Sequence, residues 1–173
     1  NTKKVMFISA ERFMYHFVRS IKSNDMVKFK DFFRRANVFI IDDIQFVGGK
    51  EAMQEEFFHT FNALMEKGSQ IVISSDRSPS NLDRIQERIR SRLSGGLVVD
   101  IQPPDKNLRL KILKSKFNHI RKNFNDTSDL NDDVFNFVAS EITSSIREMV
   151  GALNRILAFS KLNTKSPNIY ECK

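Results

Sequence analysis

Acidic residues follow two short apolar runs in the first half of the chain. Asp42 and Asp43 come directly after the run 38–41, and Asp76 follows the run 71–73 and two serines. Carboxylates at the carboxyl end of a parallel sheet suit Mg²⁺ bound to a nucleotide phosphate, with a neighbouring acid placed to orient water. The alternatives are strands that end in solvated acids and, after 71–73, a Ser-Asp turn.

Arginines at two places could meet phosphate groups. Arg84, Arg88 and Arg92 are four residues apart, so they share one face of a predicted helix. They could project toward a phosphate on this chain or a neighbour, or form a solvated face paired with nearby acids. Arg147 lies in the first turn of another predicted helix, where a cation is unfavourable unless an anion binds there. Glu148 beside it offers a structural explanation instead.

A basic stretch interleaved with Phe and Val extends from residue 12 to residue 35, offset only by Asp25 and Asp31. Such a surface could follow a nucleic-acid backbone, and an amphipathic helix pair with a solvated face explains it equally well. The three histidines show no metal-ligand spacing, and the sequence suggests no Ser-His-Asp or Cys-His arrangement. We therefore set aside catalysis by a His- or Cys-bound metal.

The elements that position these residues are predicted from hydrophobic periodicity. Four continuous apolar runs predict parallel strands buried on both faces: 5–8, 38–41, 71–73 and 97–99. Apolar residues recur every four positions between them, which predicts helices at 13–21, 53–61 and 85–93. The alternation predicts an α/β sheet layered by helices.

The pattern changes after Pro103 and Pro104. Asp105, Asn131 and Ser145 are predicted N-caps of three helices, the last with the S-x-x-E spacing of a capping box. We expect an α/β nucleotide-binding core at 1–103, a small all-helical lid subdomain at 104–173, and a hinge at the proline pair.

Composition limits the class of protein. The 173 residues carry a formal net charge of +7 and are 40% hydrophobic, which excludes disorder throughout. No apolar run approaches the ~18 residues of a membrane-spanning helix. A single cysteine excludes an internal disulfide scaffold and suits the cytoplasm. The basic excess is compatible with a polyanionic partner.

Six segments together closely resemble the AAA+ module of the DnaA family of bacterial chromosomal replication initiators. They are 9–13, 41–46, 54–62, 73–77, 101–105 and 146–154, and the resemblance extends over nearly the whole chain. The run QEEFFHTFN at 54–62 is more specific than any general AAA+ motif. The resemblance implies an AAA+ parallel sheet followed by a helical lid, with ATP and Mg²⁺ as ligands of the complete module.

Roles for the nucleotide site follow from the resemblance, residue by residue. It implies that Asp42 is the Walker B aspartate that holds Mg²⁺ and that Asp43 orients the hydrolytic water. Asp76 corresponds to the first sensor, and Arg147 to the second sensor that contacts the nucleotide from the lid.

The resemblance also implies self-association. Arg92 corresponds to the arginine finger that reaches ATP on the adjacent protomer, and Arg88 to the other basic residue of the same motif. ATP would favour a filament, and slow hydrolysis would release it.

Contacts with single-stranded DNA are implied for the two-helix insertion at about 11–35. Val18 and Lys50 correspond to positions associated with that contact in the family. Ala52 is small and apolar where several relatives carry Arg, so part of the contact is expected to be weaker.

The phosphate-binding motif G-x-x-x-x-G-K-[ST] occurs nowhere in the sequence. We expect it, with the first strand, before residue 1, and a helix-turn-helix domain for origin DNA after residue 173. The resemblance then implies that the parent is a cytoplasmic, nucleoid-associated slow ATPase that opens the origin and engages the helicase machinery, and we expect this chain alone to be inactive. The alternatives are a non-hydrolysing AAA+ regulator of the initiator and a module that only binds single-stranded DNA.

Overall fold

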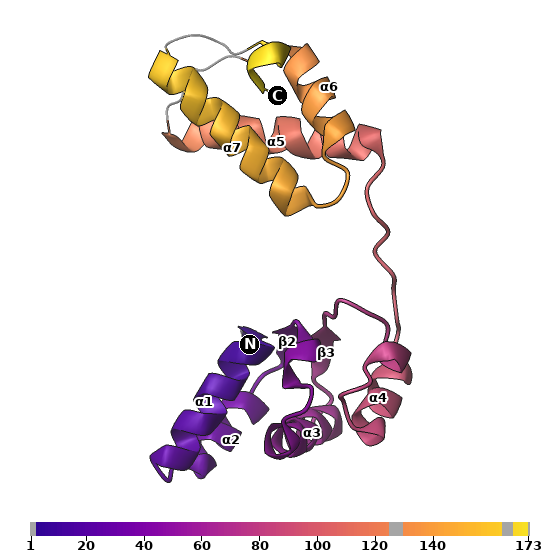
Figure 1. Cartoon of the computed structure of the whole chain (residues 1–173). Coiled ribbons are helices and arrows are strands. Elements are labelled where there is room, and N and C mark those ends of the chain that lie inside the picture. The colour runs from indigo at the N-terminus through magenta and orange to yellow at the C-terminus, as the bar shows by residue number, and fades with distance from the viewer. Residues whose placement is uncertain (1–2, 125–129, 164–167, 173) are drawn as a thin grey trace. The chain divides into compact units, whose positions relative to one another are not determined.

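The computed structural model of the chain describes residues 3–124, 130–163 and 168–172. The chain divides into two compact units, Asn1–Asp100 and Ile101–Lys173 (Figure 1).

The first unit is built on a parallel sheet with the strand order β1-β2-β3. Val5 lies opposite Val38, and Val38 lies opposite Gln70, so the three strands are in register. The elements in chain order are β1 (Val5–Ser9), α1 (Ala10–Lys22), α2 (Met26–Arg34), β2 (Val38–Asp42), the 3₁₀ helix η1 (Ile44–Val47), α3 (Glu51–Glu66), β3 (Gln70–Ile73), the 3₁₀ helix η2 (Pro79–Asn81) and α4 (Glu87–Ser94).

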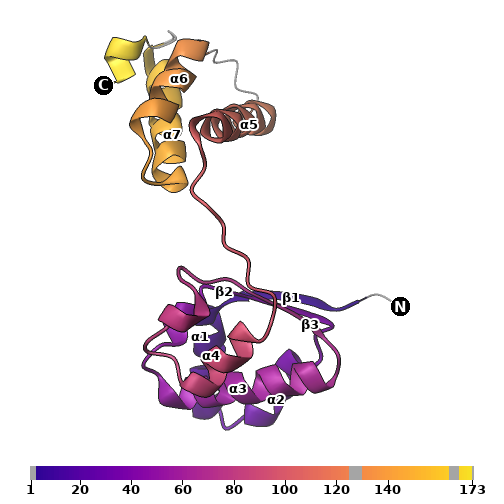
Figure 2. The ribbon, with the colours of Figure 1, turned by 90° about the vertical axis from the view of Figure 1, so that its right-hand side faces the viewer.

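Helices of the first unit cover only one face of this sheet. Figure 2 shows α1, α2, α3 and α4 on the same side. Ile8 and Ile41 on that face are buried, whereas Phe7 on the other face is 68% exposed. Each strand is added on the same side of the previous one, and right-handed crossovers then place every connecting helix on the same face. The prediction that the strands are buried on both faces is therefore wrong for the part of the chain that the structure describes.

The apolar run 97–99 does not form the predicted fourth strand. It lies outside the sheet, and Leu97 is 93% exposed. An apolar run becomes a strand only beside another strand, because its backbone groups need partners along an edge. Among residues 3–124, 130–163 and 168–172, no strand borders this run.

Phenylalanine side chains pack the α1–α2 hairpin onto the sheet. The ring of Phe33 lies 4.8 Å from those of Phe13 and Phe29, and Phe13 contacts Phe39 on β2 and Phe57 on α3. All five rings are buried. The basic stretch 12–35 is therefore carried on a hairpin fixed by an aromatic core.

The second unit is helical. Its elements are α5 (Lys106–Phe124), α6 (Asp132–Glu141), α7 (Ile146–Asn163) and the 3₁₀ helix η3 (Ile169–Cys172). Its core includes Leu113, Val134 and Leu153, one from each α-helix. None of the helices in the described part of the chain has the length and apolar character needed to cross a membrane.

The three predicted N-caps are confirmed. Asp105 Oδ1 accepts a hydrogen bond from the backbone N of Leu108 at 2.7 Å, and Asn131 Oδ1 accepts from that of Asp133 at 3.3 Å. Ser145 Oγ accepts from the backbone N of Arg147 at 3.2 Å. In a full capping box, the Glu148 carboxylate would accept a hydrogen bond from the backbone N of Ser145. Here it accepts one from the hydroxyl of the neighbouring Ser144 instead.

Candidate functional site at the carboxyl edge of the sheet

Strands β2 and β3 end at the same edge of the sheet. Ile41 pairs with Ile73 in the parallel register, so the residues that follow each strand emerge side by side. The Ser74 hydroxyl donates a hydrogen bond to Asp42 Oδ1 and accepts one from the backbone N of Asp43 at 2.9 Å. Ser74 thus fixes the carboxylate of one acid and the backbone of the next.

Asp43 has a left-handed backbone conformation with φ of 58°. Such a conformation costs a residue other than glycine about 1–3 kcal/mol, so its surroundings must hold it. Besides the Ser74 contact, Gln45 Nε2 donates to Asp43 Oδ1 at 2.9 Å, and Gln45 Oε1 accepts from the backbone N of Asp76 at 3.4 Å. Gln45 therefore links Asp43 to the segment after β3.

Asp76 shares this edge through its backbone, while its carboxylate is bound by Arg77. Arg77 Nε and Nη2 donate to the two carboxylate oxygens at 2.8 and 2.7 Å. This bidentate contact holds the pKa of Asp76 below its usual range. Asp76 is consequently an anion at neutral pH whose charge is already compensated.

The edge fits a hydrated Mg²⁺ ion held together with nucleotide phosphates. Asp42 and Asp43 offer hard oxygen donors, and Mg²⁺ commonly uses one or two carboxylates and leaves its other positions to phosphates and water. No group of three or more His, Cys, Asp or Glu residues that could hold a metal occurs within the described ranges. A metal at this edge would thus depend on ligands from a bound nucleotide.

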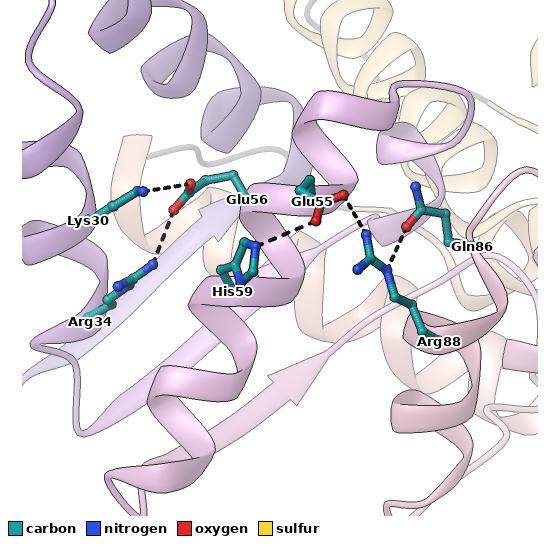
Figure 3. Close-up of polar contacts among 7 residues, drawn as sticks. All are labelled: Lys30, Arg34, Glu55, Glu56, His59, Gln86 and Arg88. Carbon is teal, nitrogen blue, oxygen red and sulfur yellow. Dashed lines mark hydrogen bonds and ion pairs between the residues drawn. The ribbon is translucent and has the colours of Figure 1, made fainter.

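The arginines expected on one helix face lie on two different segments. Arg88 and Arg92 are on α4, but Arg84 lies in the turn before it, so the predicted three-arginine stripe is wrong. Arg88 is held by neighbouring side chains: it donates to Glu55 Oε2 at 2.5 Å and to Gln86 Oε1 at 2.8 Å (Figure 3). Arg92 is exposed and makes no side-chain hydrogen bond or ion pair with the described residues.

Side chains of α3 that the sequence did not single out as functional secure the helices on either side. Glu56 is buried and pairs with Lys30 and Arg34 of α2, each at 3.5 Å. Gln54 is 1% exposed and bonds to backbone atoms in the segments before α3 and α4. The available signal was a run of polar residues between Met53 and Phe57, both predicted to face the core.

The remaining predicted site residues lie on elements other than β2 and β3. Arg147 is exposed in the first turn of α7, in the second unit. Val18 is exposed on α1, and Lys50, just before α3, is exposed and donates from Nζ to the backbone O of Phe46 at 2.7 Å. Ala52, in the first turn of α3, is exposed. Within the first unit, the structure therefore brings the three predicted acids together at one edge.

A comparison with family models decides the family. The model of the bacterial DnaA ATPase domain matches residues 1–100. The chain belongs to the DnaA family. Among curated relatives, the chromosomal replication initiator protein DnaA of Roseobacter denitrificans is 48% identical over 158 residues, which are 91% of this chain and 35% of that protein. DnaA of Rickettsia massiliae is 47% identical over 164 residues, 95% of this chain and 34% of that protein.

Solved DnaA structures share the fold. Domain III of the Thermotoga maritima replication initiation protein DnaA has a TM-score of 0.89 and 34% identity, covering 98% of this chain and 69% of that one. A replication initiator DnaA bound to AMPPCP and single-stranded DNA has a TM-score of 0.76 and 32% identity, covering 93% and 49%. These similarities confirm the predicted AAA+ α/β fold. The chain spans about a third of the length of its curated DnaA relatives.

Proposed function

We propose that this chain is the larger part of the ATPase module of a replication initiator, and that ATP controls the self-assembly of that protein on origin DNA. The observation that carries the proposal is the edge at which Ser74 and Gln45 hold Asp42 and Asp43. The DnaA relative bound to AMPPCP and single-stranded DNA supports it. The activity is proposed for the full-length protein, since the chain spans about a third of its relatives.

Within the proposed site, each carboxylate has a distinct task. Asp42 would hold Mg²⁺, which, when bound, neutralises charge on the phosphates. Ser74 keeps the Asp42 carboxylate in place by donating to it. Asp43 would accept a proton from the attacking water, and Gln45 fixes its carboxylate on one oxygen, leaving the other for water. Asp76 and Arg147 are proposed as the two sensors of the nucleotide's state.

Arg92 is proposed to complete the site of a neighbouring copy. Its guanidinium is exposed and makes no polar side-chain contact with the described residues, so nothing among them competes with an external phosphate. An arginine supplied by a second subunit stabilises the charge of the transferring phosphoryl group. ATP binding would thereby be linked to filament formation, and slow hydrolysis would end it.

Single-stranded DNA is proposed to contact the first unit through Val18, Lys50 and the basic hairpin formed by α1 and α2. Duplex opening at the origin would follow from this contact within the filament. Recruitment of the replicative helicase is proposed for the full-length protein. We also propose that it acts in the cytoplasm at the nucleoid, where the origin lies.

Replacing Arg92 in the full-length protein tests the proposed function. We expect Arg92→Ala to leave ATP affinity within about twofold, because the residue serves the neighbour's site, and to abolish ATP-dependent assembly and origin opening. Nucleotide titration, light scattering and a strand-opening assay measure these effects. Arg155→Ala, an exposed arginine on α7, is the matched control. Normal opening by Arg92→Ala would reject the proposed role of Arg92 in the neighbouring site. Absence of ATP-dependent opening by the wild-type protein would reject the initiator function and favour the non-hydrolysing regulator.

A further inference from the structure

Three successive polar residues on α3 point in different directions. Gln54, Glu55 and Glu56 are 100° apart around the helix, so one short segment reaches neighbours on opposite sides. Figure 3 shows Glu56 directed toward Lys30 and Arg34, and Glu55 directed toward Arg88. This segment lies within the family-specific run 54–62, and the proposed function leaves it without a role.

Gln54 fixes the chain segment that leads into α4. Its Nε2 donates to the backbone O of Val47 at 3.2 Å and to that of Arg84 at 3.0 Å, and its Oε1 accepts from the backbone N of Gln86 at 2.8 Å. A buried amide is stable only when its polar atoms are bonded in this way. The first residue of α4, Glu87, therefore begins from an anchored point.

The rest of α4 has few apolar anchors. The helix has eight residues, too few to be stable alone. Ile89 is its only buried residue, and the partly buried Leu93 packs against the same core. Arg88 supplies the next contact, because its guanidinium bonds Glu55 and Gln86 and lies 4.6 Å from the ring centre of Phe58. Two of these three partners, Glu55 and Phe58, belong to α3.

Arg88 and Arg92 are on the same helix but in different environments. Glu55, Gln86 and Phe58 occupy the guanidinium of Arg88, whereas Arg92 lies about one turn further, ~6 Å along the axis. For Arg88 to meet a phosphate, it would have to leave a charged hydrogen bond and an aromatic ring. Its geometry suits the attachment of α4 better than direct contact with a nucleotide.

We propose that Glu55 and Arg88 are positioning residues that hold α4 on α3 and so fix where Arg92 meets the phosphate of a neighbouring copy. The inference rests on the proposed function of Arg92. Arg88 then affects the nucleotide only through Arg92. His59 Nε2 lies 3.5 Å from the other oxygen of Glu55, so the Glu55 carboxylate is held on both oxygens.

The first test removes the charge of Glu55 in the full-length protein. We expect Glu55→Gln to raise the protein concentration needed for half-maximal ATP-dependent assembly about fivefold, since a partly exposed pair contributes modestly. ATP affinity and the midpoint of thermal unfolding should not change. The control is Glu66→Gln, an exposed acid at the other end of α3 that bonds no described side chain. Wild-type assembly by Glu55→Gln would overturn the proposal.

A charge exchange separates attachment from direct phosphate contact. We expect the double variant Glu55→Arg with Arg88→Glu to recover most of the assembly that Arg88→Glu loses, because the pair is restored with reversed sign. An Arg88 that touched phosphate could not be replaced by an acid in this way. Failure of the exchange to recover assembly would overturn the proposal.

A double-mutant cycle with Arg92 isolates the positioning role. The background is Arg92→Lys, which keeps the charge of the side chain and is expected to keep part of the assembly. If Glu55 acts through Arg92, Glu55→Gln weakens assembly less in this background than in the wild type. An equal weakening in both backgrounds would overturn the positioning role while leaving the function of Arg92 intact. Normal ATP-dependent assembly by Arg92→Ala alone would instead overturn the proposed function of Arg92, and the positioning role with it.

Discussion

Ser74 is the uncharged residue on which the arrangement of the acids depends. Its hydroxyl contacts the Asp42 carboxylate and the Asp43 backbone, and its own backbone N donates to Ile41 O at 3.0 Å. The acids themselves were predictable, because carboxylates that follow an apolar run stand out in a sequence. The contribution of Ser74 was not, since it depends on the register between β2 and β3, which local sequence does not specify.

Ser74→Ala in the full-length protein should therefore separate hydrolysis from binding. We expect single-turnover ATP hydrolysis to fall about tenfold, because misplaced acids orient metal and water less well, with a smaller change in ATP affinity. Ser75→Ala is the matched control, because among the described residues the hydroxyl of Ser75 accepts only from the backbone N of Arg77, at 3.4 Å. Equal hydrolysis rates for the two variants would contradict this role.

Helices and strands were predictable where the signal is local. The caps of α5, α6 and α7 form at the predicted residues, since a cap needs only a side chain and a backbone group a few positions away. The run 97–99 and the start of α4 were predicted wrongly, since one depends on a neighbouring strand and the other on Gln54. The α1–α2 hairpin was predictable in part. Its helices follow from local hydrophobic periodicity, but its aromatic packing depends on contacts between residues that are distant in the sequence.

Removing a buried ring from the α1–α2 hairpin should destabilise the protein much more than removing the exposed ring beside it. Phe33 is 1% exposed and packs against Phe13 and Phe29, so Phe33→Ala should lower the free energy of unfolding by about 3–5 kcal/mol. Phe32→Ala removes a ring that is 52% exposed and should cost about 1 kcal/mol or less. Urea denaturation of the full-length protein measures both. Similar losses for the two variants would show that the aromatic cluster does not support the hairpin.

At the scale of the whole molecule, the chain has a net charge of +7. Its basic residues differ in whether they form ion pairs, and α1 and α2 show this difference. The cations of α2 are paired. Lys28 pairs with Asp25, and Arg35, the C-cap of the helix, pairs with Asp31. Two further cations of α2 pair with Glu56. On α1, three exposed cations form no ion pair with any described residue: Arg12, Arg19 and Lys22. Exposed Tyr15 lies on the same helix face. The sequence predicted a basic helix pair, but only the ion pairs seen among the described residues show that the cations of α2 are paired and those of α1 are not.

Single-stranded DNA should consequently be bound by α1 rather than α2. Each unpaired cation that meets a phosphate releases a counterion, so Arg19→Ala should weaken binding and reduce the slope of log affinity against log salt by about 0.7. Arg35→Ala removes the same charge from a cation already paired with Asp31 and should change the slope by about half as much or less. Anisotropy titrations of the full-length protein at several salt concentrations measure both slopes. Equal reductions of the slope in the two variants would show that binding depends on total charge rather than on α1. A larger reduction for Arg35→Ala would show that α2 binds the DNA.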